Sequence, residues 1–321
     1  MAVTVLCADY PRVMPLASGA VPADFTLSLG RRGCWPDRAE ILQRSLNDPS
    51  VAGGEASMGI HLRRMDQGDR SVVALPVFVL RNFAPRDLYV RQGAGLTDAR
   101  QLVGKRIGMY SWTASGSIWY RHFLDWAGVP VDAVQWCIGN IDTPWGQGPD
   151  PTRPAQVAMA PSGRSLSQML LEGELDAIYS PPRPESFLPE KGPIVRLYED
   201  PRPIEEAYFK ATGVFPPQHL LVLQRAAWER DPALARRVTA AFIACEEHYQ
   251  AQLESFPYVT PWTELDVERT QSSMGANPYA HGLRENHSTM EQFCDHAFRL
   301  GLTGRRVSVE EYFREYLELC G

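Results

Sequence analysis

Three arginines of the chain stand directly after predicted strands, where a side chain can reach a bound ligand. They are Arg12, Arg81 and Arg183. A planar guanidinium makes two charge-assisted hydrogen bonds to a carboxylate, so these positions predict clamps for an acidic ligand. For each arginine, a structural ion pair or a solvated surface position is the alternative.

One histidine is well placed to move a proton. His219 follows Pro216-Pro217 and opens the apolar segment 219–223, which is typical of a strand. The ordinary pKa of a histidine, about 6.5, suits proton transfer near neutral pH. His219 is therefore the first candidate for a general acid, and a structural role at a hinge is the alternative.

Polar side chains also stand near the ends of two other predicted strands. Glu55 and Ser57 belong to one, and Asp9 and Tyr10 to the other. A carboxylate in such a place can accept a proton from a phenol, so Glu55 is the second catalytic candidate. A helix cap or a stabilising contact is the alternative for Glu55. Ser57, Asp9 and Tyr10 are candidates for ligand contact, and the orientation of Arg12 is the alternative role for Asp9.

The segment 111–116 joins a predicted strand to a predicted helix through small residues. Free backbone N–H groups at a helix N-terminus attract carboxylates. We therefore expect Ser111, Thr113 and Ser115 to donate hydrogen bonds to such a group. Trp112 is a candidate for a wall that stacks on an aromatic ring.

These residues need a scaffold that brings several strand ends together. Short apolar runs such as 3–8 and 72–80 alternate with helical patterns, and helical patterns alone follow residue 231. This alternation predicts a mainly parallel sheet covered on both faces. We predict an α/β fold of two lobes, with residues 1–85 and 216–321 in the first and 86–215 inserted as the second. Ligands of such folds bind at the carboxyl ends of strands, here in a cleft at the hinge between the lobes.

Capping residues mark two of the helices. Asp37 is predicted to cap a helix over 37–47, and Ser165 to cap one over 165–173. The stretch 141–163 is rich in proline and glycine and predicts a long surface loop.

Composition excludes several classes of protein. The 321 residues carry a formal net charge of −6, and the basic residues form no stripe that could neutralise nucleic-acid phosphates. The N-terminus lacks the cationic segment of a signal peptide, and no apolar stretch approaches the roughly 20 residues that span a bilayer. We expect a cytoplasmic protein that binds neither nucleic acid nor membrane. A homodimer is expected from chain size alone, because soluble enzymes of this size often form one.

No metal site and no covalent nucleophile are predicted. The six cysteines form no CxxC pair, and the histidines form no HxH or HxxxH pair. GxSxG and phosphate-loop signatures are absent. We expect free, mostly buried thiols and no cofactor, and Mg²⁺ held by scattered carboxylates stays open.

Motifs in a fixed order run along nearly the whole chain. They are Ala8-Asp9-Tyr10-Pro11-Arg12, Ala74-Leu75-Pro76-Val77-Phe78, the segments 102–108 and 163–177, Glu206-Ala207-Tyr208-Phe209-Lys210-Ala211-Thr212-Gly213-Val214-Phe215-Pro216 with His219, and Asn277-Pro278-Tyr279-Ala280-His281-Gly282-Leu283-Arg284-Glu285-Asn286. In these segments the chain resembles the 4,5-dihydroxyphthalate decarboxylase family. The segments 31–36 and 111–115 depart from the family's usual pattern. The resemblance implies a two-lobed, type II periplasmic-binding-protein-like fold with C-terminal helices.

The resemblance also implies an activity, the decarboxylation of a hydroxylated aromatic, phthalate-like acid. Such a substrate needs no organic cofactor, because its phenol feeds electrons to the ring carbon that accepts the proton. On this hypothesis His219 protonates the ring and Glu55 accepts the phenol proton. Two alternatives stay open. One is a carboxylate-binding protein of the same fold that acts as a solute-binding protein or sensor, and the other is a different lyase acting on a small acid.

Overall fold

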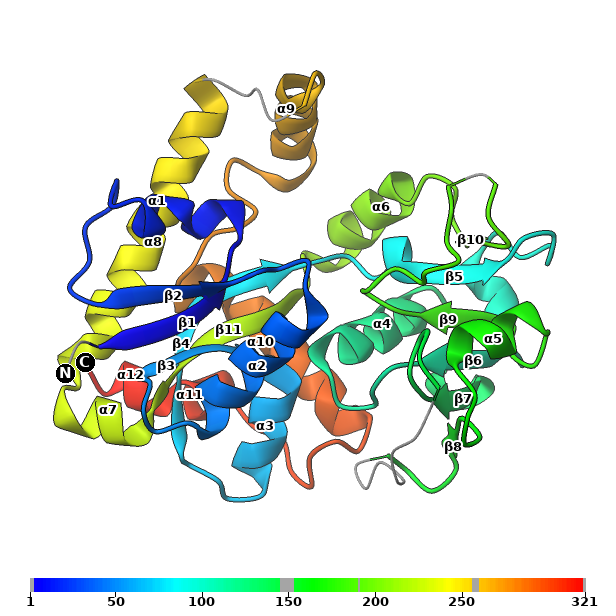
Figure 1. Cartoon of the computed structure of the whole chain (residues 1–321), viewed down its shortest axis with the longest axis horizontal. Helices are drawn as coiled ribbons and strands as arrows, with labels where there is room; N and C mark the ends of the chain where they lie inside the picture. The colour runs from blue at the N-terminus through cyan, green and yellow to red at the C-terminus, as the bar shows by residue number, and fades with distance from the viewer. Residues whose placement is uncertain (1–2, 145–152, 190, 256–259, 320–321) are drawn as a thin grey trace. The chain divides into compact units, whose positions relative to one another are not determined.

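The computed structural model describes residues 3–144, 153–189, 191–255 and 260–319 (Figure 1). The chain divides into two compact units, and the second is inserted into the first. Unit 1 consists of Met1–Arg81 and Pro217–Gly321, and unit 2 of Asn82–Pro216. The cleft and the hinge expected between two lobes stay predictions.

Unit 1 is built on a five-stranded sheet in the order β2-β1-β3-β11-β4. The strands are β1 (Thr4–Ala8), β2 (Thr26–Gly30), β3 (Gly53–Ser57), β4 (Val72–Arg81) and β11 (Pro217–Gln224). The strand β1 runs parallel to β2 and β3, whereas β11 runs antiparallel to both β3 and β4. All eight residues of β11 are buried, which explains its apolar sequence.

The direction of β11 follows from how the chain crosses between the units. The chain leaves unit 1 at Arg81, at the end of β4, and returns at Pro217, and these two residues are paired in the sheet. A strand that enters at the edge where its neighbour ends must run antiparallel to that neighbour. The start of β11 therefore lies at the carboxyl edge of the parallel strands.

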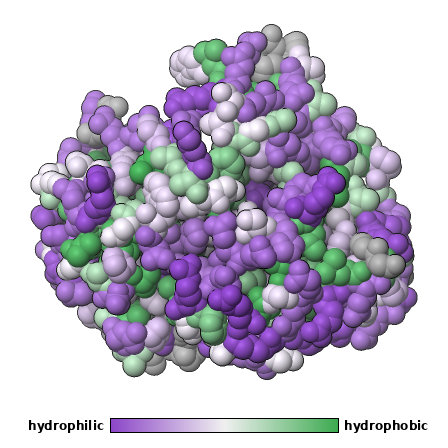
Figure 2. Space-filling view, turned by 180° about the vertical axis from the view of Figure 1, so that it is seen from behind, coloured by the Kyte–Doolittle hydropathy of each residue, from purple (hydrophilic) through white to green (hydrophobic). Residues whose placement is uncertain are grey.

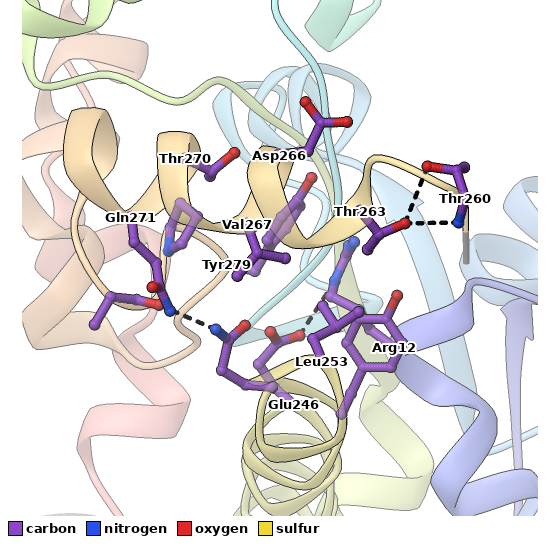
Figure 3. Close-up of a pocket in the computed structure, with 14 residues that line it drawn as sticks. Arg12, Glu246, Leu253, Thr260, Thr263, Asp266, Val267, Thr270, Gln271 and Tyr279 are labelled. Atoms are coloured by element: carbon purple, nitrogen blue, oxygen red, sulfur yellow. Dashed lines mark hydrogen bonds and ion pairs between the residues drawn. The ribbon is translucent and has the colours of Figure 1, made fainter. Parts of the chain in front are cut away.

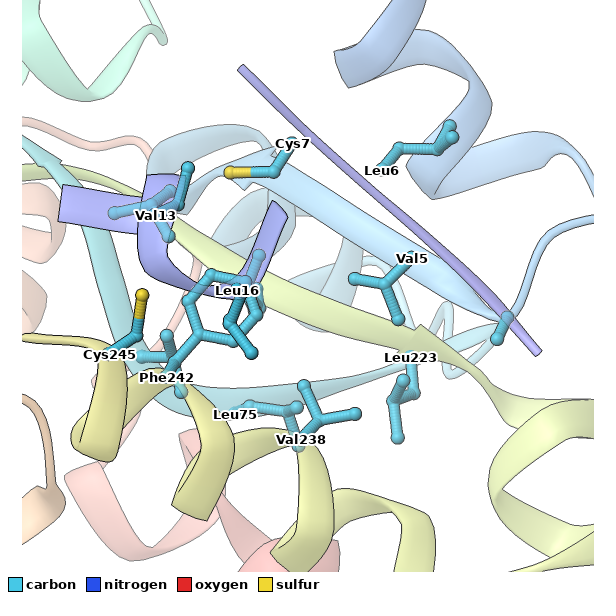
Figure 4. Packing of buried hydrophobic residues seen from close by; sticks show 14 of the residues in the cluster. Val5, Leu6, Cys7, Val13, Leu16, Leu75, Leu223, Val238, Phe242 and Cys245 are labelled. Atoms are coloured by element: carbon cyan, nitrogen blue, oxygen red, sulfur yellow. The ribbon is translucent and has the colours of Figure 1, made fainter. Parts of the chain in front are cut away.

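The helices of unit 1 lie around this sheet, apart from α9, which lies beside α8 (Figure 1). They are α1 (Met14–Ala17), α2 (Trp35–Asn47), α3 (Met58–Asp66), α7 (Arg225–Arg230), α8 (Ala233–Ser255), α9 (Thr263–Met274), α10 (Leu283–Arg299), α11 (Val309–Tyr312) and α12 (Arg314–Leu317), with a 3-10 turn η1 (Pro11–Val13). Figure 4 shows how Val238 and Phe242 of α8 pack against Val5, Leu75 and Leu223 of the strands. In contrast, α9 has no buried residue.

Unit 2 holds a six-stranded sheet in the order β10-β5-β9-β6-β7-β8. Its strands are β5 (Leu88–Arg91), β6 (Arg106–Met109), β7 (Gln135–Ile138), β8 (Ala158–Met159), β9 (Ala177–Tyr179) and β10 (Ile194–Arg196). Its helices are α4 (Ser115–Trp126), α5 (Leu166–Leu171) and α6 (Arg202–Thr212), with 3-10 turns η2 (Pro85–Asp87), η3 (Ala99–Leu102) and η4 (Val131–Ala133). The strand β5 runs antiparallel to β9 and starts beside its end, since Leu88 pairs with Tyr179.

The expectation of mainly parallel sheets is confirmed, with one antiparallel strand in each, β11 in unit 1 and β5 in unit 2. Two local expectations need correction. The helix α2 begins at Trp35, after Cys34, and its Asp37 lies in the first turn, where it binds Arg31 instead of capping the helix. The predicted loop 141–163 contains β8, and its residues 145–152 lie outside the described part. The cap at Ser165 is confirmed, because its side chain accepts a hydrogen bond from the N–H of Gln168.

The cysteines and the helices of the described residues agree with the expectations drawn from composition. Free cysteines are present at positions 7, 34, 137, 245 and 294, and all but Cys34 are buried, while Cys320 lies outside the described residues. Within the described chain, no helix is long and apolar enough to cross a membrane. On the face shown in Figure 2, hydrophilic residues predominate and hydrophobic ones are scattered among them.

Candidate functional site

The carboxyl edge of the unit 1 sheet brings together residues from three strands. Tyr10 follows β1, Glu55 and Ser57 end β3, and His219 lies near the start of β11. His219 pairs with Ser57 across the sheet, and Leu221 pairs with Glu55. Because residues two apart in a strand share a face, Glu55 and His219 are diagonal neighbours on one face.

Glu55 accepts hydrogen bonds on both oxygens. Its Oε1 accepts from the Tyr10 hydroxyl at 2.7 Å and from His219 Nδ1 at 2.5 Å. Its Oε2 accepts from the backbone N–H of Ala8 at 3.0 Å. The carboxylate is 2% exposed. Glu55 is thus already satisfied by the protein, and its geometry suits holding His219 better than receiving a proton from a phenol.

The charges in this cluster follow from burial and hydrogen bonding. Burial alone would raise the pKa of Glu55, but the hydrogen bond and charge of His219, with those from Tyr10 and Ala8, hold it below its usual value. Burial, and then the charge of Glu55, raise the pKa values of Cys7 and Tyr10 well above their usual range. Glu55 is therefore the anion of the cluster, and Cys7 and Tyr10 are neutral.

This arrangement decides the orientation of the His219 ring. An ionised carboxylate only accepts hydrogen bonds, so Nδ1 carries a proton and donates it to Glu55. In the described residues no hydrogen bond engages Nε2, and the side chain keeps 10% of its surface exposed. His219 can therefore exchange a proton through Nε2 while Glu55 holds the opposite side of the ring.

Arg12 and Arg81 lie in a second, buried cluster of unit 1. Arg12 Nε forms an ion pair with Glu246 Oε2 at 3.1 Å, and Arg12 Nη2 donates to the carbonyl of Val79 at 2.9 Å. The guanidinium lies over the ring of Tyr279, 3.8 Å from its centroid (Figure 3). Arg12 therefore already has a carboxylate partner within the protein.

Arg81 is held by the segment that follows α9. Its Nη2 donates to the side-chain oxygen of Asn286 and, at 3.2 Å, to the carbonyl of Ala280. His281 accepts a hydrogen bond from the N–H of Phe78 through Nδ1 at 3.2 Å. Burial, and then the charges of Arg81 and Arg12, lower the pKa of His281 to about 3, so this histidine is neutral.

Asp9 contacts a different arginine from the one expected. Its Oδ1 accepts from the N–H of Arg32 at 2.6 Å and lies 3.6 Å from the Arg32 guanidinium. Both side chains are exposed in part. Asp9 thus orients the start of the 31–36 loop, and Glu246 takes the place beside Arg12.

The predicted residues of the 111–116 segment lie in unit 2. Ser115 is the first residue of α4, and Thr113 and Ser115 are buried. Ser111 accepts a hydrogen bond from the N–H of Ala114 at 3.3 Å. Trp112 is 3% exposed, and the guanidinium of Arg121 lies 3.9 Å from the centroid of its ring. The face of Trp112 is thus covered by Arg121.

Arg183 is exposed in the loop after β9. Of the three predicted clamps it is the one with an exposed guanidinium, and within the described residues it forms no ion pair. Its position at the carboxyl edge of the unit 2 sheet agrees with the predicted role, which stays a prediction.

Four polar residues of these clusters were not among the candidates predicted from the sequence. Glu246 and Arg121 are single charges within helical patterns, so nothing in the sequence marks them as buried. Asn286 closes the matching motif 277–286, which was the available signal. Asp87 is buried at the carboxyl edge of the unit 2 sheet, where burial raises its pKa to about 8.

The described residues include no group of three or more His, Cys, Asp or Glu side chains arranged to hold a metal ion. The cofactor expectation stays a prediction.

The chain is similar to two curated proteins that share a name. It is 26% identical over 333 residues to the 4,5-dihydroxyphthalate decarboxylase of Comamonas testosteroni, covering 97% of this chain and 95% of that protein. It is 29% identical over 217 residues to the 4,5-dihydroxyphthalate decarboxylase of Pseudomonas putida, covering 65% of this chain and 81% of that protein. The resemblance is confirmed. No family model matches the chain.

Solved structures bear out the class of fold. The periplasmic aliphatic sulphonate binding protein SsuA of Escherichia coli superposes with a TM-score of 0.52 at 14% identity, covering 97% of this chain and 99% of that one. The alkanesulfonate-binding protein SsuA of Xanthomonas axonopodis gives a TM-score of 0.50 at 12% identity, with 97% of each chain covered. The chain therefore has a periplasmic-binding-protein-like fold.

Proposed function

We propose that this protein is a carboxy-lyase that removes CO₂ from a hydroxylated aromatic, phthalate-like acid. The observation that carries the proposal is the match to a 4,5-dihydroxyphthalate decarboxylase along 97% of the chain. The buried Glu55–His219 pair supports it, because a fixed imidazole with one open nitrogen is what protonation of a ring carbon requires.

In the proposed reaction, His219 is the proton donor. The phenol of the substrate pushes electrons into the ring, and Nε2 of the imidazolium transfers its proton to the carbon that carries the departing carboxylate. The bond to that carboxylate then breaks, its electron pair restores the aromatic ring, and CO₂ leaves. Solvent returns the proton to His219. The net change is one proton consumed and one CO₂ released, without an organic cofactor.

Glu55 is proposed as a positioning residue for this step. Its negative charge stabilises the imidazolium, and its hydrogen bond orients Nε2 away from β3. Tyr10 and Ala8 in turn hold Glu55. Its predicted role as the acceptor of the phenol proton stays a prediction.

The remaining predicted residues are proposed as substrate contacts. Asp9, Tyr10, Arg12, Ser57 and Arg81 belong to unit 1. Ser111, Trp112, Thr113, Ser115 and Arg183 belong to unit 2. A cytoplasmic location, a homodimer and the lack of nucleic-acid binding stay predictions.

The test is CO₂ release by the purified protein from 4,5-dihydroxyphthalate and a panel of hydroxybenzoates, with and without a chelator, beside calorimetric binding of the same compounds. We expect release that the chelator leaves unchanged. His219→Ala should reduce kcat by about 100-fold or more while KM stays within a few-fold. The matched control is His248→Ala on α8, outside the cluster.

Two outcomes would contradict the proposal. Tight binding without CO₂ release across the panel would make the protein a carboxylate-binding protein of the same fold, the second hypothesis. Full turnover by His219→Ala would remove the proton-donor assignment and leave the reaction itself standing.

A further inference from the structure

Unit 1 contains a cavity of about 310 Å³ between α8 and α9. Figure 3 shows α9 along one side of it, with α8 seen along its axis on the other. A volume of this size is within the range of small-molecule sites. Its lining includes Arg12, Glu246, Leu253, Val267, Thr270 and Tyr279.

Glu246 is the unusual member of this lining. Its side chain is 3% exposed, and it forms an ion pair with Arg12 at 3.1 Å. Neither carboxylate oxygen meets a hydrogen-bond donor in good geometry within the described part of the chain. A buried acceptor without a hydrogen bond costs free energy, so a ligand that donates an O–H there would be stabilised.

The charges of the cavity disfavour an acid. Arg12 is the cation of the lining, and its charge already faces Glu246. The Arg12–Glu246 pair is neutral as a whole, so a ligand that carries a charge of either sign would lose its hydration without gaining an unpaired partner there.

The remaining walls suit a flat ring. Leu253, Val267 and Pro278 supply apolar surface, and Tyr249 and Tyr279 supply aromatic surface. Thr270 and Gln271 add hydroxyl and amide groups at the α9 side. This mixture of apolar walls with a few polar groups is the usual composition of a small-molecule site.

We propose that this cavity binds a small uncharged phenol or catechol, whose hydroxyl donates a hydrogen bond to the Glu246 carboxylate. The site goes beyond the proposed decarboxylation and does not depend on it. Burial raises the pKa of Glu246 to about 7, against the opposing charges of Arg12 and Arg81. The acceptor form therefore prevails at pH 8, where binding should be measured.

The test is calorimetric titration of the full chain with catechol, phenol, benzoate and benzylamine at pH 8. We expect catechol and phenol to bind and the two charged compounds not to. Val267→Trp should fill the cavity and abolish catechol binding, whereas Glu268→Trp, on the exposed side of α9, should leave it within twofold. Because α9 has no buried residue, neither change should unfold the protein.

A second pair of variants tests the role of the carboxylate. Glu246→Gln should weaken catechol binding by about tenfold, the usual effect of losing a charge-assisted hydrogen bond. Glu247→Gln, the exposed neighbour, is the matched control. Equal catechol binding by Val267→Trp and the unaltered protein, no catechol binding at all, or preferential binding of benzoate or benzylamine would each overturn the proposal. These outcomes leave CO₂ release by the same protein untouched, so failure here is distinguishable from failure of the proposed function.

Discussion

At the scale of single residues, the Glu55–His219 pair is the feature from which the chemistry follows. Glu55 is buried and accepts hydrogen bonds from Ala8, Tyr10 and His219 Nδ1. Such a carboxylate selects one tautomer of the imidazole and stabilises its protonated form. The ability of His219 to donate a proton therefore depends on Glu55, which need not contact the substrate.

Glu55→Gln tests this dependence. The amide keeps the shape of the side chain but loses the charge that stabilises the imidazolium, so kcat should fall on the order of 100-fold with KM within about threefold. Equal kcat and KM for Glu55→Gln and the unaltered protein would contradict the positioning role.

Tyr10→Phe is the graded companion to this variant. It removes one of the hydrogen bonds to Glu55 Oε1, at 2.7 Å, and leaves those from His219 and Ala8. We expect a fall in kcat of about tenfold, smaller than that of Glu55→Gln, since a single hydrogen bond to a charged group contributes about 1.5–3 kcal/mol and the charge of Glu55 remains. A loss as large as that of Glu55→Gln would mean that Tyr10 acts on the reaction through more than its hydrogen bond to Glu55.

At the scale of the elements, the close contact of β3 with β11 positions the pair. The two strands approach so tightly at Gly53 that an added Cβ would lie 2.0 Å from the carbonyl oxygen of Val222, and the residue has a φ of +148°. Only glycine fits this place without a shift of the backbone. The register that sets Glu55 beside His219 depends on that contact.

Gly53→Ala should therefore be strongly destabilising, by about 3 kcal/mol or more in urea unfolding, because the new methyl group meets backbone atoms. Gly68→Ala is the control. Its φ is +82°, but an added Cβ would meet no atom within 4 Å, so its cost should be the conformational strain alone, about 1–2 kcal/mol. Equal costs for the two variants would show that the contact of β3 with β11 is looser than the structure describes.

At the scale of the whole molecule, buried ionisable groups set how stability depends on pH. Burial raises the pKa of Glu246 to about 7 and that of Asp87 to about 8. Both groups bind a proton more tightly in the folded state. Their contribution to stability therefore falls as the pH rises from the pKa of the unfolded state to the pKa of the folded state. Burial lowers the pKa of His61 to about 4 and that of His281 to about 3. Their contributions are complete above pH about 6.5 and are lost as pH falls.

We expect the free energy of unfolding to be nearly constant between about pH 4.5 and 6.5, where the two opposing pairs cancel. Above that range the contributions of Asp87 and Glu246 are no longer offset by those of His61 and His281, so stability should fall by roughly 2–3 kcal/mol by pH 8, at about 1.4 kcal/mol per pH unit for each titrating group. Urea unfolding of the full chain across this range checks the curve.

Asp87→Asn separates the contributions in that curve. The amide keeps the size of the side chain and cannot ionise, so the fall above pH 6.5 should shrink by more than half. An unchanged slope in Asp87→Asn would contradict the raised pKa of this carboxyl group. Asp125→Asn on α4 is the matched control in the same unit.

Much of this molecule was determined by the sequence alone. The alternation of short apolar runs with helical patterns predicted the strands from β1 to β11 except β8, which lies in a stretch predicted as a loop. The Ser165 cap was marked by residue type, because backbone conformation and burial act over neighbouring positions. Ordered motifs along the chain predicted the family resemblance. His219, Glu55 and Tyr10 were singled out because each stands near a strand end.

Only the tertiary structure decided how these residues are used. The antiparallel entry of β11 sets His219 beside Glu55, although 164 residues separate them in the chain. Likewise, Glu246 lies 234 positions from Arg12, and nothing in the neighbouring sequence marks it as buried. It nevertheless forms an ion pair with the guanidinium that was expected to bind the substrate. A side chain's hydrogen-bond partners depend on packing between distant segments, and the pattern of neighbouring residues does not predict that packing.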